Sequence, residues 1–177
     1  MKITILVEDT LSDPELQNEF GLSLLIETSM SRILMDTGKS GLYADNAKAF
    51  DINLQDLDAC VISHAHFDHG GGLEKFFNSN SDTTVYLHEK ASGEYRANAC
   101  VKLPRPFSSA LYPLIKFSRP FTRPIGLDSA VLDKNKSRID YVSKSRQITE
   151  DAFLITNISQ THALPLGNKY LLHAGAG

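Results

Sequence analysis

Metal-capable side chains are concentrated in one short stretch of the sequence, SHAHFDHGGGL at residues 63–73. Three of the six histidines, His64, His66 and His69, lie there together with Asp68. If the extended chain of a preceding strand continues, alternate residues project to one side, so His64, His66 and Asp68 are expected to point together and His69 elsewhere. We expect all four side chains to converge within a few ångströms of one another at the end of the strand 58–63. One loop could then bind two metal ions about 3.5–4 Å apart, the spacing of two-metal hydrolytic sites. Imidazole and carboxylate ligands suit Zn, Fe or Mn without a thiolate, and the three glycines that follow permit a tight turn with backbone close to the site.

Strands must position this loop, and the pattern of apolar residues predicts several. The segment 58–63, DACVIS, is apolar in its middle and is predicted to be a buried strand that ends at the motif. Residues 29–31 separate two apolar runs and predict a hairpin. The other predicted strands are 2–8, 22–28, 32–37, 83–88, 137–143, 152–156 and 169–173. Strands dominate the first part of the chain and helices come later, which favours sheets covered by helices.

Two helices are predicted beside these strands. Residues 40–50 place Leu42, Ala44, Ala47 and Phe50 on roughly one helical face, with Ser40 as the N-cap. Residues 72–78 form a short helix that directs Leu73, Phe76 and Phe77 inward. Both helices flank the histidine-rich loop in the sequence.

The segment from residue 95 to residue 127 has a different composition. It holds five of the seven prolines and six basic residues without any acidic residue. Such proline density excludes a long helix or a central strand, so we expect an irregular insertion at about 100–127. One interpretation is a solvated loop or a subunit contact. The other is a lid that presents Arg105, Arg119 or Arg123 to an anionic substrate, since guanidinium groups suit phosphate and carboxylate.

The composition is that of an ordinary globular protein. Of its 177 residues 42% are hydrophobic and 22% charged, and the formal net charge is −3. This charge gives no general attraction to nucleic acid or to an anionic membrane. Cys60 and Cys100 lie far apart and suggest neither a disulfide framework nor a zinc knuckle. No apolar run approaches the ~18 residues of a membrane span, and the N-terminus becomes acidic too early for a signal peptide. We therefore expect a cytoplasmic protein.

HAHFDH at residues 64–69 resembles the H-x-H-x-D-H signature of the metallo-β-lactamase fold superfamily. Residues 1–90, including MDTG at 35–38, are similar to a branch of metal-dependent hydrolases that also contains dihydropterin–ribofuranosylaminobenzene-phosphate synthase-like proteins. The resemblance implies an α/β (α+β) fold, an αββα sandwich, with metals at the edge of the two sheets. We expect one domain over residues 1–177 that is incomplete relative to this fold, because the likeness is weak beyond residue 100.

The resemblance also implies roles for individual residues. His64 and His66 would hold the first of two divalent ions, zinc with iron or manganese as alternatives. Asp68 and His69 would hold the second, and Asp68 would also orient the attacking water. Asp36 resembles the carboxylate that fixes a ligand imidazole, although it could equally cap the turn that follows it. Because diiron members of the superfamily place Glu where this chain has His66, hydrolysis is favoured over redox chemistry.

The loop alone supplies too few ligands for two ions, and the remaining candidates are His88, His162 and His173. Of these, His88 occupies a position that the family often fills with a histidine that is not a ligand. Two functions therefore stay open. The first is a metallohydrolase that uses a metal-activated hydroxide on a small ester, lactone, amide or phosphoester, with further ligands from outside this chain or from a partner. The second is a non-catalytic binding module with a partial metal site. We also expect the apolar sheet to be covered by a homo-oligomer contact or by a continuation of the chain.

Overall fold

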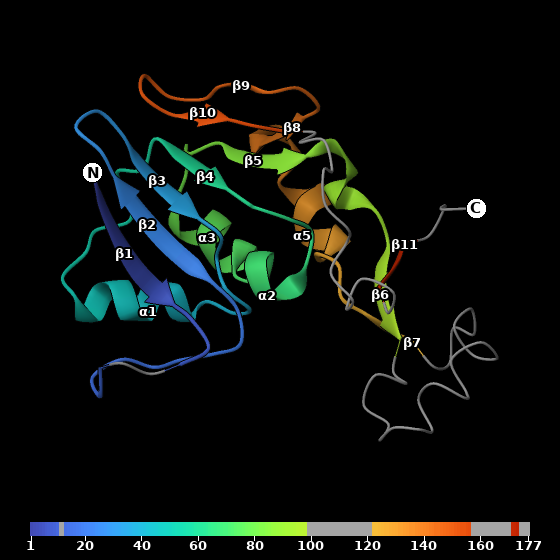
Figure 1. The fold of residues 1–177 in the computed structure, drawn as a ribbon, viewed down its shortest axis with the longest axis horizontal. Coiled ribbons are helices and arrows are strands. Elements are labelled where there is room, and N and C mark those ends of the chain that lie inside the picture. Colours follow the sequence, from blue (N-terminus) through green and yellow to red (C-terminus); the bar gives the residue numbers. More distant parts are fainter. Residues whose placement is uncertain (11–12, 99–121, 157–170, 174–177) are drawn as a thin grey trace, which may run out of the picture. The chain divides into compact units, whose positions relative to one another are not determined.

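The computed structural model describes residues 1–10, 13–98, 122–156 and 171–173 (Figure 1). The chain forms two compact units. The larger comprises residues 1–92 and 127–158, and the smaller comprises residues 93–126 and 159–177. The prediction of one domain over the whole chain stays a prediction. In the described ranges, no helix is both long and apolar enough to cross a membrane.

A six-stranded mixed sheet forms the centre of the larger unit, in the order β1-β2-β3-β4-β5-β8. Its strands are β1 (Lys2–Val7), β2 (Ser23–Glu27), β3 (Arg32–Met35), β4 (Ala59–Val61), β5 (Val85–His88) and β8 (Ile139–Val142). The first three strands pair antiparallel, and β3, β4, β5 and β8 pair parallel. The strands predicted from apolar runs at 2–8, 22–28, 32–37, 58–63, 83–88 and 137–143 are thus confirmed.

Helices cover one face of this sheet (Figure 1). They are α1 (Leu42–Ala49), α2 (Phe67–Gly70), α3 (Leu73–Ser79) and α5 (Ser129–Lys134), with short 3₁₀ helices at η1 (Glu89–Ser92) and η4 (Lys136–Arg138). Leu34, paired with Leu25 on one side and Cys60 on the other, lies in a continuous buried row across the strands. The central parallel strand β4 (ACV) is an unbroken apolar run because it lies in this buried centre.

The inward face of α3 agrees with the prediction, but that of α1 does not. Leu73, Phe76 and Phe77 are buried as expected. In α1 the buried residues are Tyr43, Asn46 and Ala47, whereas Phe50 is 44% exposed. Asn46 can be buried because its Nδ2 donates to the backbone carbonyls of Leu6 and Gln17, at 2.7 and 2.8 Å.

The predicted N-cap of α1 is also wrong by one residue. Gly41 is the N-cap, and no side chain caps the helix. The hydroxyl of Ser40 accepts a hydrogen bond from the backbone N–H of Leu42 at 3.2 Å, but Ser40 lies one residue before the N-cap. Nearby, Oε1 of Glu19 accepts from the backbone N–H groups of Lys39 and Ser40, so a carboxylate from a distant loop contacts this turn instead.

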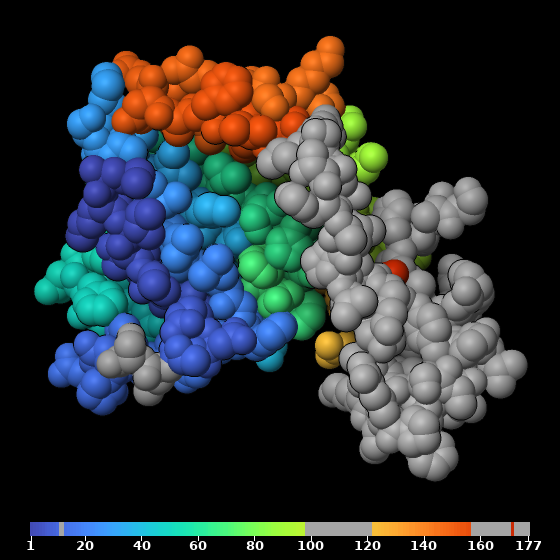
Figure 2. Space-filling model, in the orientation of Figure 1, coloured from blue at the N-terminus to red at the C-terminus, as the bar shows by residue number. Residues whose placement is uncertain are grey.

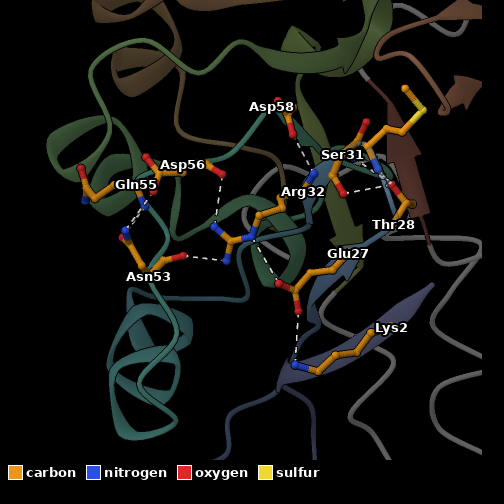
Figure 3. A network of polar contacts seen from close by, with 10 residues as sticks. Lys2, Glu27, Thr28, Ser31, Arg32, Asn53, Gln55, Asp56 and Asp58 are labelled. Carbon is orange, nitrogen blue, oxygen red and sulfur yellow. Dashed lines mark hydrogen bonds and ion pairs between the residues drawn. The ribbon is translucent and has the colours of Figure 1, made fainter.

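A polar network fixes the start of β3, at the end of the strand away from the histidine-rich loop (Figure 3). The Arg32 guanidinium donates to the Asn53 carbonyl at 2.8 Å and to Glu27 Oε1 at 3.3 Å. The Arg32 backbone N–H donates to Asp58 Oδ2 at 2.7 Å, and Lys2 contacts the other oxygen of Glu27 at 3.3 Å. These contacts fix the connection that precedes β4 to the start of β3. The other ends of β3 and β4 lead to the candidate site.

The N-terminal strand is exposed over its first part, whereas Leu6 and Val7 at its end are buried. Ile3 and Ile5 of β1 are 52% and 54% exposed, and β1 lies at the surface in Figure 2 (dark blue). Two further strands of the larger unit, β9 (Arg146–Gln147) and β10 (Phe153–Leu154), form a separate antiparallel pair. That the apolar sheet is covered by a second copy or by further chain stays a prediction.

The smaller unit holds a three-stranded antiparallel sheet in the order β11-β6-β7. Its strands are β6 (Tyr95–Asn98), β7 (Thr122–Pro124) and β11 (Leu171–His173). Residues 122–124 of the predicted insertion at 100–127 form the edge strand β7, so this part is extended without being a central strand, and Pro124 is its last residue, where a missing N–H is tolerated. Residues 99–121 of that segment lie outside the described residues.

Candidate metal centre

Asp36 lies at the centre of the candidate site, immediately after β3. It is fully buried and adopts a left-handed backbone conformation with φ 60°. Its backbone N–H donates to the Val61 carbonyl at 2.8 Å, and its own carbonyl accepts from the Ser23 hydroxyl at 2.8 Å. The carboxylate is thereby held at the ends of β3 and β4, pointing to the loop that follows β4.

Three donors converge on the Asp36 carboxylate. Oδ1 accepts from the Ser63 backbone N–H at 2.7 Å, and Oδ2 lies 2.7 Å from the Ser63 hydroxyl and 2.7 Å from His69 Nδ1. The contact with His69 is the one that the family resemblance implied. The alternative, an aspartate that only caps its own turn, does not account for a contact with a residue 33 positions away.

The loop after β4 turns into a helix sooner than strand alternation predicts. His66 is still extended, at φ −100° and ψ 147°, and α2 begins at Phe67. The expectation that His69 projects away from the other ligands is therefore wrong. One helical turn brings the His69 ring next to His64, with ring centroids 4.1 Å apart.

The four motif side chains lie together. The rings of His64 and His66 have centroids 4.6 Å apart, and His64 Nε2 lies 3.1 Å from His66 Nδ1. His69 Nε2 lies 3.7 Å from the carboxylate of Asp68, which is mostly buried. The group is thus a set of three imidazoles and one carboxylate at the end of the sheet.

The surroundings favour neutral imidazoles. Partial burial lowers the pKa of His64, and the neighbouring rings of His69 and His66 lower that pKa further. Partial burial is also the main cause that lowers the pKa of His66, against the opposing effect of Asp68. A neutral imidazole is the form that coordinates a metal ion.

Backbone contacts fix the loop to the turn after β3. The N–H of Thr37 donates to the His69 carbonyl at 2.7 Å, and that of Gly71 donates to the Gly38 carbonyl at 3.0 Å. The N–H of Leu22 donates to the Asp68 carbonyl at 3.3 Å. These contacts leave no room for a side chain at Gly72, where a Cβ would overlap with the carbonyl oxygens of Thr37 and Ser40. The glycines after the motif serve close packing, since Gly71 and Gly72 have ordinary negative φ values.

We expect Gly72→Ala to lower the free energy of unfolding by about 1–3 kcal/mol, the cost of forcing extra volume into packed backbone. The matched control is Gly126→Ala, where a Cβ would have no neighbour closer than 3.4 Å. That variant should stay within about 0.5 kcal/mol of the unsubstituted protein in urea unfolding. Equal stabilities for the two variants would contradict the close packing at Gly72.

Of the other predicted site residues, His88 belongs to the larger unit, whereas Arg123 and His173 belong to the smaller one. His88 ends β5, and its Nδ1 accepts from the Lys90 backbone N–H at 3.2 Å. Arg123 is exposed in β7, and the backbone of His173 pairs with Tyr95 in the small sheet. His162, Arg105 and Arg119 lie outside the described residues. Although the motif side chains lie close together, no three His, Cys, Asp or Glu side chains among the residues that the structure describes are arranged so that they could hold a metal ion.

Ser63 is a residue of the candidate site that the sequence did not predict. Ser63 contacts both Asp36 and His64, with its hydroxyl 3.0 Å from His64 Nδ1. The available signal was its position directly before the motif, at the end of a predicted strand.

Comparison with known proteins assigns this fold and loop to a family. The profile of the Metallo-beta-lactamase superfamily matches residues 17–122, more than half of the chain. The chain belongs to this superfamily. A crystal structure described as a metal-dependent hydrolase of the beta-lactamase superfamily superimposes with a TM-score of 0.68 at 24% identity, over 97% of this chain and 53% of that one. This likeness shows the fold, and the expected α/β class is confirmed.

Curated relatives match half of the chain or less. The 7,8-dihydropterin-6-methyl-4-(beta-D-ribofuranosyl)-aminobenzene-5'-phosphate synthase of Methanocaldococcus jannaschii is 35% identical over 98 residues, 50% of this chain and 32% of that protein. A probable RNase of the same organism is 36% identical over 72 residues, 40% of this chain and 17% of that protein. The transcription termination factor FttA of Methanothermobacter thermautotrophicus is 35% identical over 75 residues, 38% of this chain and 12% of that protein. The match thus spans a third or less of each of these relatives.

Proposed function

We propose that this chain is a metal-dependent hydrolase, or the part of one that carries its first metal ligands. The observation that carries the proposal is the contact of 2.7 Å between the buried Asp36 carboxylate and His69 Nδ1. Ligand imidazoles in metal sites are oriented by such a contact at the nitrogen that does not bind the metal. His64 and His66 would hold one divalent ion, and Asp68 and His69 a second, with zinc as the first choice and iron or manganese as alternatives.

The donor set fits such ions. Three imidazoles and one carboxylate are ligands for zinc, iron or manganese, and the lowered pKa values of His64 and His66 keep both rings in the ligating, neutral form. His64 Nε2 and His66 Nδ1 now contact each other at 3.1 Å. Binding would exchange this hydrogen bond for bonds to an ion.

The chemistry divides between the bound ion and the chain. A divalent ion supplies a Lewis acid and lowers the pKa of a bound water toward neutrality. Asp36 holds His69 in one orientation, and the backbone contacts of Thr37 and Leu22 hold the loop. Asp68, with its carboxylate beside His69, would accept a proton from the attacking water and align it.

We favour a phosphoester among the ester-type substrates. Two relatives support this choice by their names, one a synthase of a 5'-phosphate compound and one a probable RNase. That Arg119 and Arg123 bind such an anion stays a prediction. We further propose that the substrate is a small molecule and that the protein is a homo-oligomer in the cytoplasm.

The first test is metal content and its dependence on single histidines. Purified protein loaded with zinc should hold the ion after dialysis, and His64→Ala should lose at least one ion or weaken its binding about 10–100-fold. His88→Ala is the matched control, because the resemblance to the family gives His88 no role as a ligand. Hydrolysis of bis(4-nitrophenyl) phosphate and of 4-nitrophenyl acetate should follow the metal content. Zinc retention that is identical in both variants would refute the assignment of the ligands.

The second candidate is a non-catalytic binding module. The observation in its favour is that the described residues contain no group of three ligands arranged to hold an ion. Such a module would retain no tightly bound zinc and would hydrolyse neither substrate, so the same experiment separates the two functions.

A further inference from the structure

Ser63 connects the buried carboxylate to a second imidazole. It follows β4 and precedes His64, and it makes three contacts with these neighbours. Its backbone N–H donates to Asp36 Oδ1 at 2.7 Å, and its Oγ lies 2.7 Å from Asp36 Oδ2 and 3.0 Å from His64 Nδ1. The side chains of Asp36, Ser63 and His64 thus form a continuous hydrogen-bonded chain.

The direction of each hydrogen bond in this chain is determined by the groups involved. A carboxylate accepts only, so the single hydrogen of the Ser63 hydroxyl must point to Asp36 Oδ2. The hydroxyl can then only accept from His64, and His64 Nδ1 must carry the proton. The opposite nitrogen of His64, Nε2, is left with its lone pair.

Two neighbouring contacts agree with this assignment. His69 Nδ1 contacts the same Oδ2 atom at 2.7 Å and must also be the protonated nitrogen of its ring. His64 Nε2 lies 3.1 Å from His66 Nδ1, a distance that fits a hydrogen bond donated by His66 to a bare Nε2. A proton on His64 Nε2 would require reversing two contacts.

We propose that Ser63 is a positioning residue that relays the hydrogen bond of Asp36 to His64 and thereby fixes His64 as the Nδ1–H tautomer. One buried carboxylate then orients two imidazoles, His69 directly and His64 through the hydroxyl. The use of this tautomer, with the His64 Nε2 lone pair directed to an ion, rests on the proposed function. The tautomer itself does not, because it follows from contacts within the chain.

The test reads the tautomer directly in metal-free protein. Long-range ¹H–¹⁵N spectra of the imidazoles, recorded above the ordinary histidine pKa of about 6.5, distinguish a protonated from an unprotonated nitrogen. His64 signals are assigned by their loss in His64→Asn. We expect a protonated Nδ1 in the unsubstituted protein. Ser63→Ala should give a mixture of tautomers, because Ser63 is exposed and the water that replaces its hydroxyl can donate or accept.

Two further variants make the result specific to the relay. Ser63→Thr keeps a hydroxyl and should restore the Nδ1–H tautomer. Ser23→Ala removes a hydroxyl that contacts the Asp36 backbone carbonyl instead of its carboxylate, and it should leave the His64 spectrum unchanged. An unaltered His64 tautomer in Ser63→Ala would overturn the proposal, as would equal changes in Ser63→Ala and Ser23→Ala.

Zinc titration of the same variants connects the relay to the site. The zinc dissociation constant of Ser63→Ala should rise about 10-fold, with that of Ser63→Thr close to the unsubstituted value. If the unsubstituted protein binds no zinc, the proposed function fails, whereas the spectra still decide whether Ser63 sets the tautomer.

Discussion

Replacing Asp36 with alanine is expected to lower the free energy of unfolding by about 3–5 kcal/mol. The carboxylate is fully buried and accepts hydrogen bonds from Ser63 and His69, and hydrogen bonds to a charged group contribute about 1.5–3 kcal/mol each. Asp36 already carries a Cβ at φ 60°, so the unfavourable left-handed conformation is present before and after the substitution and the loss comes from the hydrogen bonds. Urea unfolding of the metal-free protein measures the sum.

Two substitutions at the same position separate these contributions. Asp36→Gly removes the side chain without the conformational cost and should be about 1 kcal/mol more stable than Asp36→Ala. Asp36→Asn tolerates the left-handed conformation and keeps the acceptor for the Ser63 N–H, but its amide nitrogen cannot accept from His69. We expect it to be the most stable of the three variants. A loss below about 1 kcal/mol in Asp36→Ala would show that the carboxylate does not hold the site together.

Asp68→Asn is expected to reduce kcat/KM for phosphoester hydrolysis by roughly 10²–10⁴-fold, the range that a positioned proton acceptor contributes. Stability should change little, because the fold depends on the backbone carbonyl of Asp68, which accepts from the Leu22 N–H. The amide fills the same volume and cannot accept a proton from water at neutral pH. The measurement is steady-state hydrolysis by zinc-loaded protein, together with urea unfolding.

Asp45→Asn is the matched control for this variant. Asp45 is an exposed acid in the first turn of α1, so its substitution changes the net charge by the same amount away from the site. Its kcat/KM should equal that of the unsubstituted protein. Full activity of Asp68→Asn at unchanged metal content would remove Asp68 from the proposed mechanism.

Elements that depend on local patterns could be predicted from the sequence. The apolar runs at 22–28 and 32–37, with a turn between them, form the hairpin of β2 and β3, with Leu25 opposite Leu34. The periodic residues Leu73, Phe76 and Phe77 form the buried face of α3. These predictions succeed because the apolar residues themselves supply most of the energy of burial.

The pattern of apolar residues did not predict the buried face of α1, because a distant segment allows a polar side chain to be buried there. In α1 the apolar residues Leu42 and Phe50 suggested one inward face, whereas the structure buries Asn46. Its amide becomes satisfied only when the carbonyls of Leu6 and Gln17, 40 and 29 residues away, reach it. No local pattern reports the position of those carbonyls.

The candidate site divides in the same way. The sequence by itself determined which groups are present, because three imidazoles and a carboxylate lie within six residues after a buried strand. Only the tertiary structure decided how they point. His69 faces His64 because α2 begins at Phe67, and Asp36 reaches Ser63 and His69 because pairing of β3 with β4 places the ends of both strands together. The types of the side chains are local properties of the chain. The hydrogen bonds of Asp36 with Ser63 and His69, which follow it by 27 and 33 positions, exist only after the sheet has formed.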